Sequence, residues 1–199
     1  MHRLIAALAD VGNGDASTDH WNLPPSTAYI SPMLTLILLW LLTVLAMEGF
    51  AYVMHRWVMH GPGWFLHESH HRVRHGRFEL NDLYGAIFAV PSIVLIYGGV
   101  QAGWGDWATA VGIGIATYGA IYFGFHDVIV HRRLAHRYIP KSAYMKRIVQ
   151  AHRLHHAIES KHHGLSFGFI FAPPIDKLMV QLDSSRAKLR SPTGRETPA

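Results

Sequence analysis

Three apolar segments of membrane-spanning length constrain this chain more than any other feature. They cover residues 32–54, 84–100 and 107–125, and the first of them contains one charged residue, Glu48. A helix needs about 17–25 residues to cross the hydrocarbon core of a bilayer. Because lipid offers the backbone no hydrogen-bonding partners, helices are favoured there. The sequence therefore predicts an all-α integral membrane protein with three transmembrane helices.

The basic residues predict how these helices are oriented. Arg3 is the only one before the first segment, and residues 101–106 contain none. By contrast, four arginines follow the first segment, and eight Lys or Arg lie between residues 132 and 161. Because basic loops remain in the cytoplasm, we expect a multi-pass protein of the cell inner membrane with its C-terminus inside. The formal net charge of +5 then fits contact with anionic lipid, and nucleic acid is not expected as a partner.

The chain is expected to have three parts. Residues 1–30 should form a loose N-terminal arm, residues 31–182 the membrane domain with its histidine-rich helical cap, and residues 183–199 a disordered polar tail. Within the domain, residues 141–159 have the pattern of an amphipathic helix.

The apolar residues 165–172 are too few to cross a bilayer and are expected to lie in the interface or to re-enter the membrane. A fourth crossing that also includes residues 175–182 is the alternative, although Asp176 and Lys177 disfavour it.

Fourteen of the sixteen histidines fall into two windows, residues 55–75 and 126–163. Both windows begin where an apolar segment ends, and both contain the pattern His-X4-His followed by His-X2-His-His. The members of this repeat are His55, His60, His67, His70, His71, His126, His131, His152, His155 and His156. Ten histidines could give each of two metal ions about five nitrogen ligands. Surface histidines near lipid headgroups would not be expected to repeat this pattern.

The spacing within the repeat suggests how the rings meet. Helix positions i, i+3 and i+4 share a face, so His67, His70 and His71 are expected to converge on one point, as are their counterparts in the second window. His55 and His60 are about 140° out of phase on a regular helix. The Gly-Pro-Gly sequence at 61–63 predicts a helix break that would let His60 turn inward.

His126 and His131 have no such break beside them, and a π-bulge or a helix end would serve instead. The absence of cysteine excludes disulfides, iron–sulfur clusters and cysteine zinc sites. Imidazole suits iron, zinc, copper and nickel, so the ligands alone do not name the metal. A metal transporter or store and a bis-histidine haem protein remain alternatives. A transporter would, however, place its ligands near the middle of the bilayer.

The chain resembles the bacterial β-carotene 3-hydroxylase family, within the fatty acid hydroxylase superfamily of histidine-rich di-iron membrane proteins. The resemblance runs from about residue 33 to residue 182. It includes both histidine patterns and the segments ELNDLY (79–84), FHD (125–127), RYIP (137–140), SFGF (166–169) and APP (172–174). His75, His136, His162 and His163 lie outside the pattern and are not expected to bind metal.

The resemblance implies two non-haem iron ions held by the ten histidines. It also implies O2 and a reductant, delivered by a ferredoxin, as co-substrates. The implied reaction is 3-hydroxylation of β-ionone rings, taking β-carotene through β-cryptoxanthin to zeaxanthin, with canthaxanthin as a further substrate left open. A hydroxylase of the same superfamily that acts on a sterol or fatty acyl chain is the alternative.

This chemistry suits a membrane site. The ring C–H bond is unactivated, so an oxygen-activating metal must supply the reactivity while the protein binds and orients the substrate. The carotenoid is already dissolved in the bilayer beside the predicted site. The basic cytoplasmic surface could dock the electron donor, and contact with lipid headgroups explains it equally well.

Several other residues are candidates for the site. Glu48 lies on one helical stripe with Tyr52 and His55, and we predict that it hydrogen-bonds a metal-binding histidine or its neighbours, with arginine pairing as the alternative. Asp127 could orient its neighbour His126. Asn81 and Asp82 are expected to cap the following helix. Five aromatic residues are candidates for the substrate pocket, namely Tyr84, Phe88, Tyr118, Tyr122 and Phe167.

Overall fold

The computed structural model describes residues 31–73 and 76–190. The chain divides into two units, Met1–Ser31 and Pro32–Ala199, and every element below belongs to the second. The arm expected over residues 1–30, His75 and the last nine residues of the expected tail lie outside the described residues.

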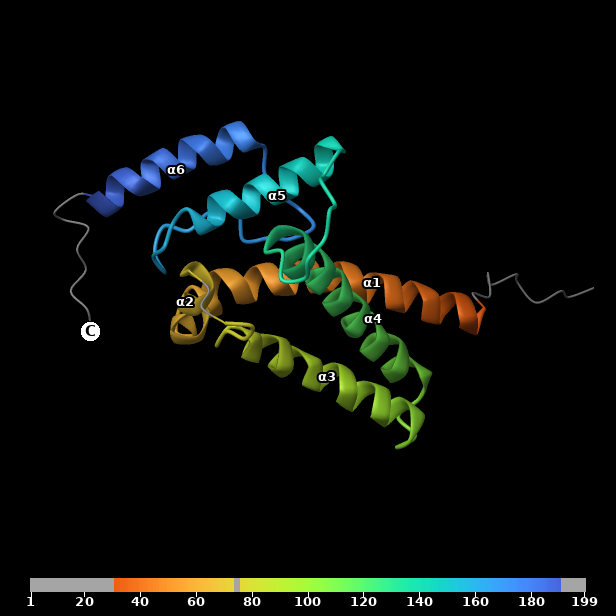
Figure 1. Ribbon diagram of the computed structural model, residues 1–199. Coiled ribbons are helices and arrows are strands. Elements are labelled where there is room, and N and C mark those ends of the chain that lie inside the picture. The colour runs from red at the N-terminus through yellow and green to blue at the C-terminus, as the bar shows by residue number, and fades with distance from the viewer. Residues whose placement is uncertain (1–30, 74–75, 191–199) are drawn as a thin grey trace, which may run out of the picture. The chain divides into compact units, whose positions relative to one another are not determined.

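The described residues form helices and contain no strand, which confirms the predicted all-α class. The elements run in the order α1 (Pro32–Val53), η1 (Met54–Met59), α2 (Trp64–His71), α3 (Asp82–Val100), α4 (Asp106–Tyr122), η2 (Phe123–Val130), α5 (Ala143–His156) and α6 (Ile175–Arg190) (Figure 1). The two η elements are π-helices that continue α1 and α4 without a break.

Three helices are long and apolar enough to cross a membrane, as predicted. They are Pro32–Met59, Asp82–Val100 and Asp106–Val130. Residues 165–172 are not helical, so they do not form a fourth crossing with α6.

The spanning helices pack through α4. It lies against both α3, with which it forms a hairpin, and α1 (Figure 1). Small residues permit this close approach, since a Cβ at Gly112 would lie 2.9 Å from the Ser92 carbonyl oxygen and one at Gly114 would lie 2.7 Å from the Thr43 side chain. Hydrogen bonds cross both contacts, from Ser92 Oγ to the Gly112 carbonyl and from Trp40 Nε1 to Thr117 Oγ1.

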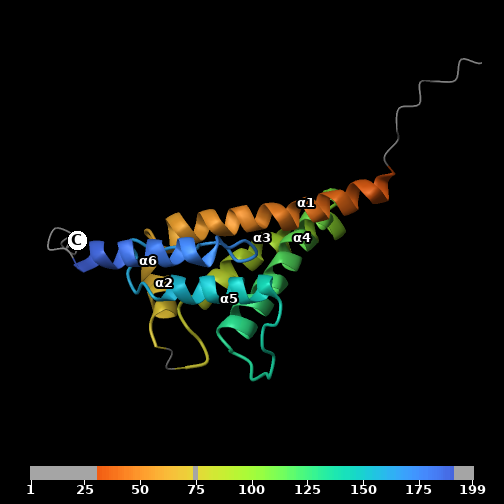
Figure 2. The same cartoon turned by 90° about the horizontal axis from the view of Figure 1, so that it is seen from above.

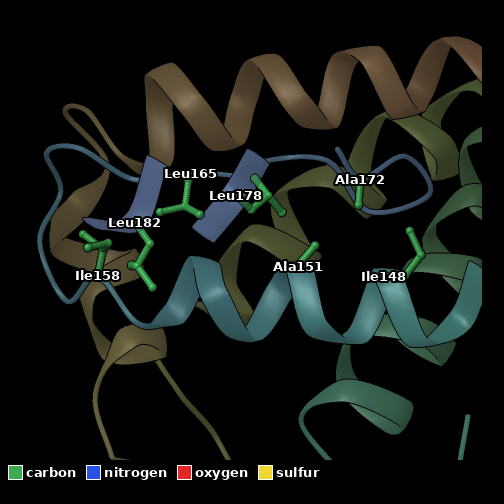
Figure 3. Close-up of a cluster of buried hydrophobic side chains, with 7 residues drawn as sticks. All are labelled: Ile148, Ala151, Ile158, Leu165, Ala172, Leu178 and Leu182. Carbon is green, nitrogen blue, oxygen red and sulfur yellow. The ribbon is translucent and has the colours of Figure 1, made fainter. Parts of the chain in front are cut away.

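Helices α5 and α6 lie side by side (Figure 2). The cluster of apolar side chains that joins them is fully or nearly fully buried and consists of Ile148, Ala151, Ile158, Leu165, Ala172, Leu178 and Leu182 (Figure 3). Burial of a side chain such as that of Ile158 or Leu178 contributes about 1.5–3 kcal/mol. This cluster positions α5, and with it His152, His155 and His156.

The expected disorder from Asp183 onward is wrong as far as Arg190, because α6 continues to that residue. Leu178 and Leu182 are spaced i, i+4 and both are buried, so packing stabilises the helix where it contacts α5. Ala187, Lys188 and Leu189 are good helix formers, which extends it. The polar composition of this segment therefore reflects the solvated side of a helix.

Candidate metal centre

The structure brings all ten histidines of the repeat together in two groups of five. One group contains His55, His60, His67, His71 and His155, and the other contains His70, His126, His131, His152 and His156. Within each group, one ring nitrogen per residue lies within 4.8 Å of the others. Two nitrogens bound to one ion at about 2.1 Å would lie at most about 4.2 Å apart. Each group could therefore hold a metal ion after small shifts of its rings.

The two windows exchange one histidine each. His70 belongs to the first window but lies in the second group, and His155 makes the reverse crossing. The expected convergence of His67, His70 and His71 on one point is therefore wrong for His70. Successive helical residues point 100° apart, so His70 and His71 cannot both face one ion. Helix α2 and helix α5 therefore each contribute one histidine to the group that is formed mainly by the other window.

The π-helices resolve the spacing of the two His-X4-His pairs. The backbone N–H of His60 donates to the carbonyl of His55 at 3.0 Å, and His131 donates to His126 at 2.9 Å. This i to i−5 bonding brings residues five apart onto one side of the helix. The paired ring centroids lie 5.2 Å and 4.5 Å apart. The bulge proposed for the second pair is present, and the first pair has one as well as the Gly-Pro-Gly break.

Four of the ten rings are oriented by backbone carbonyls. His55, His60, His71 and His155 each donate a hydrogen bond from Nδ1, at 2.9, 3.3, 3.0 and 2.7 Å. The carbonyls that accept these bonds belong to Phe167, Lys161, Ile158 and Leu165. A carbonyl only accepts, so Nδ1 carries the proton and Nε2 is left with a lone pair.

The free Nε2 atoms face one another. Those of His60 and His155 lie 3.2 Å apart, and those of His55 and His67 lie 3.1 Å apart. With both Nδ1 atoms of the first pair protonated, neither Nε2 has a proton to share in the neutral ring. Nε2 of His71 is also buried and has no hydrogen-bond partner among the described residues. Facing lone pairs of this kind fit a shared cation.

Burial keeps these imidazoles neutral. It lowers the pKa of His60 to about 3 and that of His156 to about 3, with neighbouring histidines adding to the effect. Burial is also the main cause that lowers the pKa of His155 well below its ordinary value. Neutral imidazole is the form that binds metal.

Side chains orient three further rings. Asn81 Oδ1 accepts from His67 Nδ1 at 2.7 Å, and Glu79 Oε2 accepts from His70 Nδ1 at 2.9 Å. The orienting role predicted for Asp127 fits its contact with His126 Nδ1 at 3.3 Å. Asn81 occupies the N-cap position of α3, but its side chain makes no capping bond and faces the histidine instead. The role of Glu79 was missed, although it belongs to the ELNDLY segment.

Among the described residues, Glu48 hydrogen-bonds to neither an imidazole nor an arginine. Its Oε1 accepts the backbone N–H groups of Phe169, Ile170 and Phe171 at 2.9, 2.9 and 3.1 Å, and its Oε2 accepts the Tyr118 hydroxyl at 2.7 Å. The predicted bond to a histidine is therefore absent from the described contacts. We term residues 165–172 the strap. Glu48 instead accepts hydrogen bonds from the backbone of this strap.

The strap connects this carboxylate to the histidines. Its Leu165 and Phe167 carbonyls orient His155 and His55, and the Phe169 ring lies 5.0 Å from that of His126. Backbone that is not helical is tolerated at membrane depth when protein groups satisfy it. Glu48 therefore acts on the histidines through the strap.

An apolar cavity of about 650 Å³ lies among α1, α3 and α4 and extends to His55. Four of the five predicted aromatic residues line it, namely Tyr84, Phe88, Tyr118 and Tyr122. Phe167 does not line this cavity. Phe167 packs on the rings of His55 and His60 instead, whereas Phe169, two residues further along the strap, lines the cavity.

The histidines outside the repeat also lie outside both groups, as far as the structure describes them. His162 and His163 are exposed, and His136 donates from Nε2 to the Val128 carbonyl at 2.7 Å.

Fold and site together define a helical membrane protein with two imidazole clusters beside an apolar cavity. The family model for fatty acid hydroxylases matches residues 40–180, and the chain belongs to this family. It is a hydroxylating oxidoreductase.

Several curated relatives share most of the chain. The "Beta-carotene hydroxylase" of Paracoccus sp. (strain PC1) is 49% identical over 153 residues, which cover 76% of this chain and 93% of the relative. The "Beta-carotene hydroxylase" of Pantoea ananas is 48% identical over 141 residues, covering 70% and 79%. The chloroplastic "Beta-carotene hydroxylase 1" of Capsicum annuum is 37% identical over 134 residues, covering 65% and 41%. No solved structure matches the chain. The resemblance noted in the sequence is thereby confirmed.

Proposed function

We propose that this protein hydroxylates the β-rings of a carotenoid at carbon 3, taking β-carotene through β-cryptoxanthin to zeaxanthin. The observation that carries the proposal is the apolar cavity with His55 in its wall. A hydrocarbon ring that enters this cavity comes to rest beside the histidine groups. The names of the curated relatives favour the same substrate class.

We further propose that the two histidine groups hold two iron ions. The facing Nε2 atoms, the protonated Nδ1 atoms and the absence of thiols in the sequence support a site built from neutral imidazole. Bound iron, with O2, two electrons and two protons, would supply the oxidising power that an unactivated C–H bond requires. One oxygen atom enters the substrate and the other leaves as water.

The protein's own residues bind and orient the substrate. Phe50, Phe88 and Ile93 provide apolar walls along the cavity, and Tyr84 also lines it. The Tyr84 hydroxyl donates to the Gly63 carbonyl at 2.9 Å, which ties the cavity wall to the turn before α2. A ring of the substrate is thus held while the polyene extends among apolar side chains. Release and re-entry would present the second ring.

The elements that carry the histidines meet at one side of the spanning helices. The C-terminal end of Pro32–Met59, the N-terminal end of Asp82–Val100 and the C-terminal end of Asp106–Val130 must share a membrane face, because consecutive crossings alternate in direction. Basic residues concentrate in the loops at this face, so we assign it to the cytoplasm of the inner membrane. A soluble ferredoxin could deliver electrons there.

The test is expression of the full chain in cells that accumulate β-carotene, followed by chromatography of the pigments. Zeaxanthin and β-cryptoxanthin are the expected products. His155→Ala provides the matched negative control, because it removes one ring from the described site. Unchanged β-carotene in cells that contain folded protein would refute the substrate assignment, and feeding a fatty acid or sterol would then test the alternative. Purified active protein without iron would refute the metal assignment.

A further inference from the structure

One arginine connects two of the carboxylates that orient histidines. Arg133 Nε lies 2.9 Å from Asp127 Oδ1, and its Nη2 lies 3.4 Å from Glu79 Oε2 and 2.6 Å from Asp82 Oδ1. Its side chain is 14% exposed, and those of Asp127 and Glu79 are 11% and 9% exposed. These charges are therefore mostly shielded from water and depend on one another.

The backbone brings Arg133 to this place. Arg132 has a left-handed φ of 51°, which ends η2 and turns the chain back. The backbone N–H of Arg133 then donates to the Asp127 carbonyl at 2.9 Å. The guanidinium is consequently held over the end of η2, opposite the residues that precede α3.

The carboxylates of Glu79 and Asp127 both orient rings of the same histidine group. Glu79 holds His70 and Asp127 holds His126, and the Nε2 atoms of these two rings face each other at 3.0 Å. The other group has a different support, since four of its rings are held by backbone carbonyls and the fifth by the Asn81 amide. Only one of the two groups therefore depends on charged side chains for these hydrogen bonds.

We propose that Arg133 is a positioning residue for one metal of the pair, the one held by the group of His70 and His126. This inference rests on the metal assignment proposed above. The planar guanidinium fork spans two carboxylates at once, which a lysine ammonium cannot do with the same geometry. Without it, the carboxylates of Glu79, Asp82 and Asp127 repel one another and release the two rings. The group of His55 and His155 keeps its supports.

The experiment compares Arg133→Met and Arg133→Lys with wild-type protein, each purified as the full chain in detergent from iron-supplemented cells. Iron is counted per chain by mass spectrometry, and its extraction by a chelator is followed with time. Arg72→Met is the matched control, because Arg72 also pairs with two carboxylates, those of Glu68 and Glu159 at 3.0 Å each, and neither bonds an imidazole in the described contacts.

Loss of a residue that orients a metal ligand typically weakens metal binding about 10–100-fold. Arg133→Met should therefore retain about one iron per chain, or release one iron about 10–100-fold faster while the other leaves at the wild-type rate. Arg133→Lys should lie between this variant and wild type, and it serves alone if Arg133→Met does not accumulate. Arg72→Met should release both irons as wild type does.

Two results would overturn the inference. One is wild-type extraction of both irons from both Arg133 variants, and the other is an equal acceleration of both irons, which a merely structural role would produce. Wild-type protein that binds no metal would instead refute the metal assignment itself, and this inference with it.

Discussion

Replacing Glu48 by alanine should release the strap from α1 and disable the site without touching a histidine. The carboxylate accepts four hydrogen bonds, from the N–H groups of Phe169, Ile170 and Phe171 and from the Tyr118 hydroxyl. Alanine leaves these donors without their acceptor. The Phe171 side of the strap is exposed, so the loss falls mainly on the other three.

The magnitude follows from the donors that lose their partner. A buried donor left unsatisfied costs about 1–3 kcal/mol, so the partly buried N–H groups of Phe169 and Ile170 together cost at most about 2–6 kcal/mol. This is a large part of the about 5–15 kcal/mol by which folded domains are stable. Since the strap carbonyls of Leu165 and Phe167 orient His155 and His55, its displacement should also loosen metal binding.

A graded set of variants makes the prediction quantitative. Tyr118→Phe removes one bond and should cost about 1 kcal/mol. Glu48→Gln keeps an oxygen acceptor but loses the charge, which roughly halves the strength of such bonds, so it should lie between Tyr118→Phe and Glu48→Ala. Gly168→Ala should resemble the stronger variants, because its Cβ would lie 3.0 Å from Glu48 Oε1 and 2.7 Å from the Phe171 carbonyl oxygen.

The assays are the midpoint of thermal unfolding in detergent and β-carotene hydroxylation in isolated membranes. Both should fall in the order wild type, Tyr118→Phe, Glu48→Gln and Glu48→Ala. Wild-type stability and activity in Glu48→Ala would refute the reasoning, since the strap would then be held by other contacts.

Three further predictions concern the histidines, their supports and the cavity. Alanine at His70 or His155 should abolish hydroxylation, whereas alanine at the exposed His162 should retain most of it, as pigment analysis would reveal; equal losses at all three would contradict the grouping. Asn81→Ala should weaken metal binding about 10–100-fold, measured by chelator competition, while Asn81→Asp should bind nearly as wild type does because it keeps an acceptor. Ala116→Trp should fill part of the cavity and lower β-carotene turnover more than tenfold, by about 1.4 kcal/mol or more, with iron content unchanged; loss of iron would instead indicate misfolding.

Local patterns in the chain were sufficient to predict much of the molecule. The apolar segments predicted three spanning helices, and the amphipathic pattern predicted α5 within three residues of its bounds, Ala143–His156. The repeated histidine spacing selected the ten residues that come together. These features depend on helical periodicity and on the length of apolar runs, which are properties of neighbouring residues.

The partners of particular side chains depended on packing between distant segments. His70 and His155 join the opposite groups because adjacent helical residues diverge by 100° and α2 faces α5 across the site. Glu48 binds backbone more than a hundred residues away, and Asn81 orients a ring where a helix cap was expected. Spacing along one helix therefore identified the histidines, while their division between two groups follows from contacts that form only when the helices and the strap pack together.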